Sequence, residues 1–239
     1  AMNMIARGHG LYCMDMNGQW YGDPEILVGV KDVLGLYQRQ LEWPGPAQAD
    51  VAFFLGEDSI NHLGDSEEAS RFLMRVTRRH RPEWDTSGVP YHLYLQRDIA
   101  DPKLPDYKVY VFLMPQRLET AERQAIEALK RDGHTLVFLH APGICDSADA
   151  ESAIRAVVGL RARRVPGSET PLAGRWLDAQ DPLLDGLAGP FGDRPIPWRF
   201  TDRESRGLAF AIDDPEATPL ACYRDDPARS EERRVGERG

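Results

Sequence analysis

The chain has 239 residues, of which 42% are apolar, and it carries a formal net charge of −9. This length is enough to bury one substantial hydrophobic core, while the acidic surface argues against binding to nucleic acid or to anionic membranes. No apolar run reaches the roughly 18 residues needed to cross a membrane, and residues 1–7 lack the apolar core of a signal peptide. We therefore expect a soluble, cytoplasmic protein.

The cysteines and histidines predict neither a disulfide framework nor a metal site. Cys13, Cys145 and Cys222 are far apart and odd in number, unlike the paired spacing of disulfide or zinc motifs. The six histidines show no HExxH or comparable ligand spacing. Because the chain also lacks a Walker loop and a glycine fingerprint after a strand, the sequence predicts no metal and no cofactor.

Residues 1–46 form the first predicted unit, which holds a strand, a helix and a linker. The short apolar run at 9–16 is expected to be a buried strand. Residues 23–25 are typical of a helix start, with an acid at the N-cap and proline at the first helical position. Apolar residues recur at helical spacing up to Leu41, and the proline-rich segment 44–46 indicates a linker.

Residues 47–160 alternate between strand and helix patterns, which predicts a parallel sheet. Such alternation implies right-handed crossovers with helices on both faces. Four strands in about a hundred residues suit a flavodoxin-like, three-layer αβα domain of α/β class. The predicted strands are 51–55, 91–95, 107–113 and 135–139, and the predicted helices begin at 65, span 120–131 and follow an N-cap at Ser147.

Residues 161–239 are predicted to be an irregular, β-containing extension of that domain. Proline and glycine interrupt this part of the chain often, and short, antiparallel strands are predicted at 197–201, 208–212 and 218–223. The last ten or so residues are charged and almost devoid of apolar side chains, so we expect disorder there. Because a final strand–helix unit is missing from the pattern, we also expect a truncated C-terminus.

The loops after the first, third and fourth predicted strands are the expected place for a ligand, because open parallel sheets bind ligands at the carboxyl ends of their strands. These residues are either a small-ligand site or only caps and turn formers. The second interpretation is favoured, since one fold hosts many functions or none. The loop residues in question are Glu57, Asp58, Ser59, Asn61, Pro115, Gln116, His140 and Cys145.

Cys145 is the candidate nucleophile of an alternative hypothesis. It lies between a predicted strand and a predicted helix, where a helix N-terminus stabilises a thiolate, and class I glutamine amidotransferases place a cysteine nucleophile at a similar point. The sharp strand-to-helix turn that exposes such a nucleophile needs small residues beside it, whereas Ile144 and Asp146 flank the cysteine here. A neighbouring acid also disfavours a thiolate, so these residues argue against catalysis by Cys145.

Trp20, Tyr21 and Asp15 are the candidate sugar-binding residues. A tryptophan in an open turn can stack on the apolar face of a sugar, while Asp15, Gln19 or Asp23 bind its hydroxyl groups. The alternative is a hydrophobic plug at a domain junction. Adjacent acidic residues elsewhere in the chain do not predict a glycosidase pair, because neighbours in sequence rarely lie on opposite sides of one glycosidic bond.

Several segments in this order resemble the C-terminal part of β-galactosidase-type glycoside hydrolases. HGLYCMDM at 9–16 and GQWYGDPE at 18–25 resemble the last strand and last helix of the β/α-barrel in β-galactosidases that carry a trimerisation domain. LPDYKVYVFL at 104–113 resembles the central strand of that domain, as does KRDGHTLVF at 130–138, which APG follows at 141–143. The likeness covers most of residues 8–160.

The resemblance implies a flavodoxin-like, amidotransferase-like domain without the amidotransferase nucleophile, which helps to assemble a homo-oligomer, in that family a trimer. It also implies that the two catalytic glutamates belong to barrel strands before residue 1, so that this chain alone is not catalytic. Trp20 matches residues at the barrel mouth that line the sugar site. Cys13 stands where an aromatic residue is expected.

Three hypotheses follow from the sequence. The first is a non-catalytic accessory and oligomerisation domain of a β-galactosidase-like protein of carbohydrate metabolism, whose carbohydrate substrate binds in the parent protein. The second is a standalone amidotransferase-like enzyme that uses Cys145. The third is a small-molecule-binding module of flavodoxin type.

Overall fold

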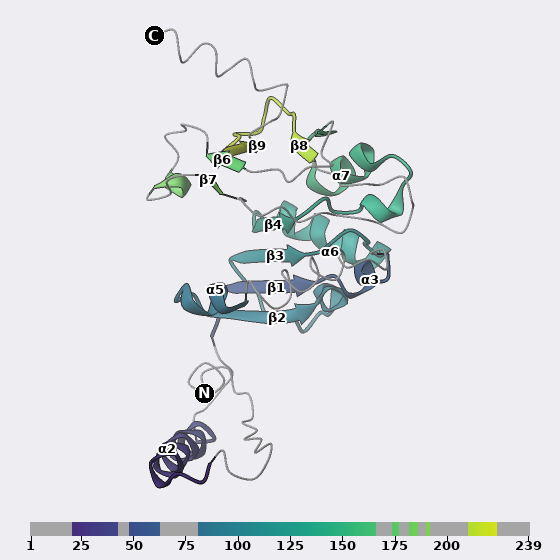
Figure 1. The fold of residues 1–239 in the computed structure, drawn as a ribbon. Helices are drawn as coiled ribbons and strands as arrows, with labels where there is room; N and C mark the ends of the chain where they lie inside the picture. The colour runs from purple at the N-terminus through teal and green to yellow at the C-terminus, as the bar shows by residue number, and fades with distance from the viewer. Residues whose placement is uncertain are drawn as a thin grey trace.

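The architecture is that of a computed structural model of the whole chain (Figure 1). It describes residues 21–42, 48–62, 81–165, 174–176, 182–185, 190–191 and 210–223. Five structural predictions lie outside these ranges: the strand at 9–16, the linker at 44–46, the helix beginning at 65, the strand at 197–201 and the disorder of the last ten residues.

A four-stranded parallel sheet organises the central part of the chain. Its strands are β1 (Val51–Leu55), β2 (Tyr91–Leu95), β3 (Val109–Leu113) and β4 (Thr135–Leu139), in the order β2-β1-β3-β4. Three strands have the bounds that their apolar runs predict. β3 begins two residues later than predicted, because the amides of Lys108 and Val109 both donate to Asp50 O before the ladder starts.

One face of the sheet carries a row of stacked aromatic rings. Tyr94, Phe54, Phe112 and Phe138 lie side by side across all four strands, with ring centroids 5.5, 5.5 and 5.0 Å apart. Each such aromatic pair stabilises the fold by about 0.5–1.5 kcal/mol beyond the free energy gained from burying the area of its rings. This face is covered by Ile126 of α6 (Thr120–Arg131) and Val157 of α7 (Ala150–Val158).

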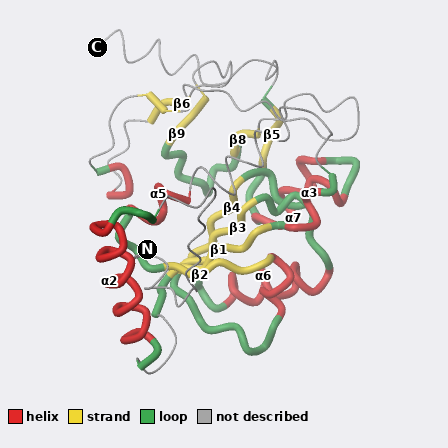
Figure 2. Tube along the Cα trace, turned by 60° about the horizontal axis from the view of Figure 1, so that its bottom comes forward, coloured by secondary structure: helices red, strands yellow, loops and turns green. Residues whose placement is uncertain are grey.

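The opposite face is covered by a different helix. Trp84 of α5 (Arg81–Thr86) stacks on Phe53 with centroids 4.3 Å apart and meets the edge of Tyr91. Figure 2 places α5 and α6 on opposite sides of the sheet, which confirms the prediction of helices on both faces. This face is incompletely covered at β4, where Val137 is 39% exposed and Leu139 is 41% exposed.

Helix α2 (Pro24–Gln40) precedes the sheet and begins as predicted. The side chain of Asp23 accepts a hydrogen bond from Glu25 N at 2.8 Å, which identifies Asp23 as the N-cap. No residue of α2 is buried, and apolar side chains such as Leu27 and Leu34 are exposed. Within the described ranges, no helix is both long and apolar enough to cross a membrane.

The N-cap predicted for α7 is wrong by two residues. The cap is Asp149, whose carboxylate accepts the amides of Glu151 and Ser152 at 3.1 and 3.2 Å. Ser147 instead accepts the amide of Asp149 itself. One oxygen of Asp149, Oδ1, thus satisfies two of the unpaired first-turn amides, while Oδ2 accepts the Ser152 hydroxyl at 2.5 Å. Ser147 stabilises the turn before the helix.

Short antiparallel pairs follow the parallel sheet, as predicted for the C-terminal part. β5 (Ala162–Arg164) pairs with β8 (Phe210–Ile212), and β6 (Gly174–Trp176) lies between β7 (Pro190–Phe191) and β9 (Ala221–Tyr223). β8 and β9 fall within the predicted strands at 208–212 and 218–223. The remaining short helices are α3 (Glu57–Ile60), η2 (Gln96–Ala100), η3 (Ile144–Asp146) and η4 (Pro182–Leu184).

A substitution at Tyr107 tests the polar link between β2 and the chain that enters β3. The buried Tyr107 hydroxyl lies 2.7 Å from His92 Nδ1 and 2.5 Å from the Tyr94 hydroxyl. Tyr107→Phe should lower the free energy of unfolding by about 1 kcal/mol at neutral pH, as measured by urea denaturation. Equal stability of variant and wild type would contradict the link.

The same variant should change the alkaline stability of the protein. Burial raises the pKa of the Tyr107 hydroxyl above its usual value, so above about pH 10 the unfolded chain loses this proton first and wild-type stability falls. Urea denaturation at rising pH should show a smaller fall in Tyr107→Phe. Tyr21→Phe is the control, and it should follow the wild-type curve.

Candidate functional site

The candidate site lies where the strand order of the parallel sheet reverses. β1 is flanked by β2 on one side and by β3 on the other, and such a reversal opens a crevice at the carboxyl ends of the two central strands. The cavity found there has a volume of about 260 Å³ and opens to solvent. We call it the edge pocket, and its lining residues are Asp58, Asn61, His62, Arg117 and Glu119.

The first wall of the edge pocket is α3, which begins directly after β1. Gly56 connects the two elements, and its amide donates to Leu113 O at 2.8 Å. A Cβ at Gly56 would lie 2.0 Å from Met114 O, so the end of β1 can approach the end of β3 only with glycine here. This close approach brings Asp58 and Asn61 beside the loop after β3.

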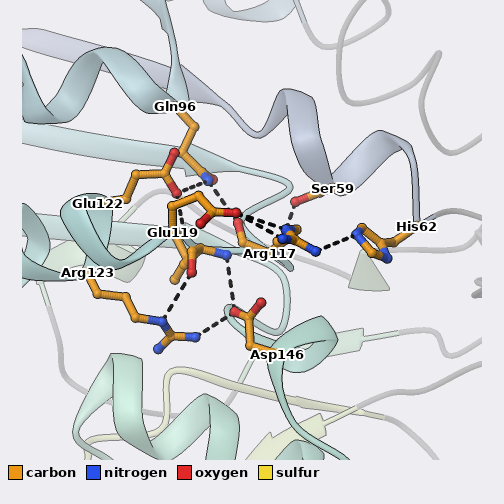
Figure 3. Close-up of polar contacts among 9 residues, drawn as sticks. Ser59, His62, Gln96, Arg117, Glu119, Glu122, Arg123 and Asp146 are labelled. Carbon is orange, nitrogen blue, oxygen red and sulfur yellow. Dashed lines mark hydrogen bonds and ion pairs between the residues drawn. The ribbon is translucent and has the colours of Figure 1, made fainter.

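The second wall is the loop at residues 114–119, which polar side chains from three other loops hold in place. Ser59 Oγ accepts the amide of Arg117 at 3.0 Å, and Gln96 Nε2 donates to Arg117 O at 2.8 Å. Asp146 Oδ2 accepts the amide of Leu118 at 3.1 Å. Figure 3 shows these side chains converging on Arg117 and its neighbours, so the loop is fixed from the ends of β1, β2 and β4.

The inner part of the crevice is filled by the protein itself. Met114, Pro115 and Gln116 are fully buried. Gly143 N donates to Pro115 O at 2.8 Å, and Gln116 Nε2 donates to His140 O at 3.1 Å, which ties the loop to the chain after β4. Only the outer rim of the crevice therefore remains accessible as the edge pocket.

The guanidinium of Arg117 is the central donor group of the edge pocket. Its Nε and Nη2 donate to Glu119 Oε1 at 3.2 and 3.0 Å, and its Nη1 lies 3.1 Å from His62 Nε2. Because arginine has no acceptor, His62 Nε2 must accept, which places the ring proton of a neutral His62 on Nδ1. The hydrogen bond with Glu119 raises the pKa of Arg117 above its usual value, so Arg117 stays charged.

A buried carboxylate lies behind the pocket wall. Glu122 Oε2 accepts the amide of Glu119 at 2.7 Å and Gln96 Nε2 at 2.9 Å. Burial raises the pKa of Glu122 above its usual value, whereas these two hydrogen bonds stabilise its charged form. The side chains of Glu122 and Gln96 are almost fully buried, so we assign them a structural role in holding the loop at residues 114–119.

Strained backbone is concentrated at the ends of β3 and β4. Met114, His140 and Ala141 have φ values of 59°, 124° and 42°, a region that non-glycine residues rarely adopt and that costs about 1–3 kcal/mol each. Burial lowers the pKa of His140 to about 4, so its ring is neutral at physiological pH. Phe210 of β8 lies beside this ring, with centroids 6.3 Å apart.

Cys145 does not occupy the strained turn that an exposed nucleophile needs. It lies within η3, its amide donates to Gln116 O at 2.9 Å, and it packs against an apolar cluster that includes Ile144 and Ile154. The carboxylate of Asp146 pairs with Arg123 at 2.6 Å. The strained positions after β4 are taken by other residues, and Cys145 does not line the edge pocket.

The structure brings together only part of the predicted loop residues. Asp58 and Asn61 line the edge pocket, whereas Ser59 and Gln116 are buried beneath it and Glu57 accepts the amide of Gln96 at 2.9 Å. Three further residues that line the pocket, His62, Arg117 and Glu119, were not predicted from the sequence. The available signal was their place in the sequence: His62 follows Asn61 directly, and Arg117 and Glu119 lie one and three positions after Gln116.

The predicted sugar-binding residues do not meet the edge pocket. Trp20 and Asp15 lie outside the described residues. Tyr21 is half-buried two residues before the N-cap of α2 and is not among the pocket residues. In the described part of the chain, no group of three or more His, Cys, Asp or Glu side chains is placed to hold a metal ion.

A substitution at Gly56 tests the close approach of β1 and β3. Gly56→Ala should lower the free energy of unfolding by about 2–3 kcal/mol or more, because the new Cβ meets backbone atoms that cannot move aside. Gly35→Ala in α2 is the matched control, since nothing lies within 4 Å of its added Cβ. The control should be stabilised by about 0.5–1 kcal/mol, and thermal unfolding distinguishes the two. Equal effects would refute the packing constraint.

Comparison with known proteins adds no family assignment to this geometry. The sequence matches no protein-family model and no curated protein.

Proposed function

We propose that this chain is a non-catalytic accessory and oligomerisation part of a β-galactosidase-type glycoside hydrolase, with a flavodoxin-like domain at residues 47–160. The strand order β2-β1-β3-β4 supports the fold, because flavodoxin-like sheets begin with the order 2-1-3-4. The segments that carry the resemblance, 104–113 and 130–138, include β3 and most of β4. They therefore lie next to each other in the sheet.

The exposed apolar surface of β4 is the observation that carries the oligomerisation proposal. β4 is an edge strand of the described sheet, and its outward side chains Val137 and Leu139 are exposed. An edge strand with an apolar face favours association unless it is covered. A homo-oligomer, a trimer by resemblance, would bury this surface.

The geometry of the strand ends supports a non-catalytic role. Cys145 packs within η3, away from the strained turn at His140 and Ala141. No observation favours the amidotransferase-like alternative over the accessory role. We propose that the groups that cleave the glycosidic bond belong to a preceding barrel in the parent protein.

Helix α2 supports an association with such a barrel. Ile26 and Leu34 are exposed, although they recur with Val30, Val33 and Tyr37 at the helical spacing of one apolar face, and Leu27 beside them is exposed as well. We propose that they pack against the barrel, and that Asp15, Trp20 and Tyr21 line its sugar site in a cytoplasmic enzyme.

Oligomeric state tests the proposal directly. Sedimentation velocity of the full chain should show a trimer, and Val137→Lys and Leu139→Lys should each shift the population towards monomer, because a lysine resists burial in an apolar interface. Val89→Lys, at an exposed apolar residue outside β4, is the control and should remain trimeric.

Two results would refute the proposal. One is a wild-type chain that is monomeric at tens of micromolar while its circular dichroism shows a folded protein. The other is enzymatic activity of the purified chain, since the proposal assigns no catalytic group to its residues. Such activity would be seen as hydrolysis of aryl galactosides, or as a turnover that is lost when Cys145 is rapidly alkylated.

A further inference from the structure

The edge pocket has no role in the proposed oligomerisation, and it has features of a built ligand site. It lies at the carboxyl ends of β1 and β3, whereas the exposed residues Val137 and Leu139 belong to an outer strand. Its volume of about 260 Å³ is below the range of about 300–1,000 Å³ of drug-sized sites. The pocket therefore suits a single-ring molecule and is too small for a dinucleotide.

The charges of the pocket exclude an anion as the natural occupant. Asp58 and Glu119 contribute two carboxylates, and Arg117 contributes the only positive charge among the pocket residues. Glu119 already binds Arg117 through two hydrogen bonds, so that pair is neutral as a unit. The carboxylate of Asp58 remains, and it would repel a phosphate or a carboxylate ligand.

The remaining hydrogen-bonding groups suit hydroxyl groups. Arginine has five N–H donors, and the described partners of Arg117 engage three of them, which leaves two for a ligand. His62 presents Nδ1–H as a further donor, while Asp58 and the Asn61 amide supply acceptors. A hydroxyl group both donates and accepts hydrogen bonds. Adjacent hydroxyl groups on one ring can therefore bind the donors and the acceptors that lie next to each other in the pocket.

The pocket wall is held rigid by side chains that are buried. Ser59 and Gln96 bind the amide and the carbonyl of Arg117 at 3.0 and 2.8 Å, and both are at least nine-tenths buried. Arg117 is thus fixed through its backbone and, by Glu119 and His62, through its guanidinium. Such preorganisation lowers the entropy that a ligand loses when it binds.

We propose that the edge pocket binds a small, neutral, polyhydroxylated ligand of single-ring size, such as a monosaccharide. Asp58 and Asn61 accept its hydroxyl hydrogens, and Arg117 and His62 donate to its oxygens. The proposal stands independently of the proposed oligomerisation, because it uses none of the residues of β4.

Ligand-detected NMR and calorimetry on the full chain test this site with four probes: galactose, glycine, putrescine and inorganic phosphate. Galactose should bind with a Kd on the order of millimolar, as expected of a small pocket with few contacts. Glycine, putrescine and phosphate, which represent a zwitterion, a cation and an anion, should bind at least about tenfold more weakly.

Two variants locate the binding. Asp58→Ala should weaken galactose binding about tenfold, because a hydrogen bond to a charged group is lost, and Asn61→Ala should weaken it less. Asp132→Ala, at an exposed carboxylate after α6, is the matched control and should bind as wild type does. All three variants should keep the oligomeric state of the wild type, so a failure of this proposal is distinguishable from a failure of the proposed function.

Three outcomes would overturn the proposal. They are no galactose binding at concentrations of tens of millimolar, galactose binding that Asp58→Ala leaves unchanged, and tighter binding of phosphate, glycine or putrescine than of galactose. The last would show that charge, and not hydroxyl geometry, selects the ligand.

Discussion

The close contact between the end of β1 and the loop after β3 is the constraint on which the rest of the structure depends. Gly56 permits it, since any side chain there would meet the backbone of Met114. Once the loop lies this near, Ser59 and Gln96 reach its amide and carbonyl groups, and Asp146 reaches it from the end of β4. The buried backbone of the loop is thereby satisfied by side chains, as buried polar groups require.

This constraint also determines which part of the crevice stays open to solvent. Because Met114, Pro115 and Gln116 fill the inner crevice, the accessible site is displaced outward to the polar rim around Arg117. The sheet itself is stabilised by its aromatic row and needs no ligand to complete its core. Exposed apolar side chains lie on β4 and α2, and also at Leu41, Val89, Leu93, Leu183 and Ile212. None of them lines the edge pocket, so the proposed assembly surface is separate from it.

The regular elements of the fold were predictable because local chemistry determines them. The apolar runs at 51–55 and 135–139 predicted strands with the bounds that the structure has, and Asp23 before proline indicated the start of α2. Errors arose where two residues compete for one role: Asp149 caps α7 instead of Ser147 because its Oδ1 accepts two first-turn amides while its Oδ2 accepts the Ser152 hydroxyl. The short helix α5 was missed because its stability comes from Trp84 packing on the sheet, not from its own sequence.

The site was only half predictable, for a physical reason. The sequence placed the loops after β1 and β3 at one edge of the sheet, but it did not show which side chains of the second loop face solvent. Gln116 is buried and donates to His140 O, whereas Arg117 and Glu119 line the pocket. The burial of Gln96 and Glu122 was not predictable either. Polar residues are usually exposed, and they are buried only where hydrogen-bond partners satisfy their polar atoms.

Native-state hydrogen exchange of the loop after β3 tests the central claim most directly. If side chains from three loops hold it, the amides of Arg117, Leu118 and Glu119 should exchange nearly as slowly as those of β3, because their hydrogen bonds open only with the sheet. Ser59→Ala should speed exchange at Arg117 selectively. Exchange of these three amides at the rate of an unstructured surface loop would contradict the account.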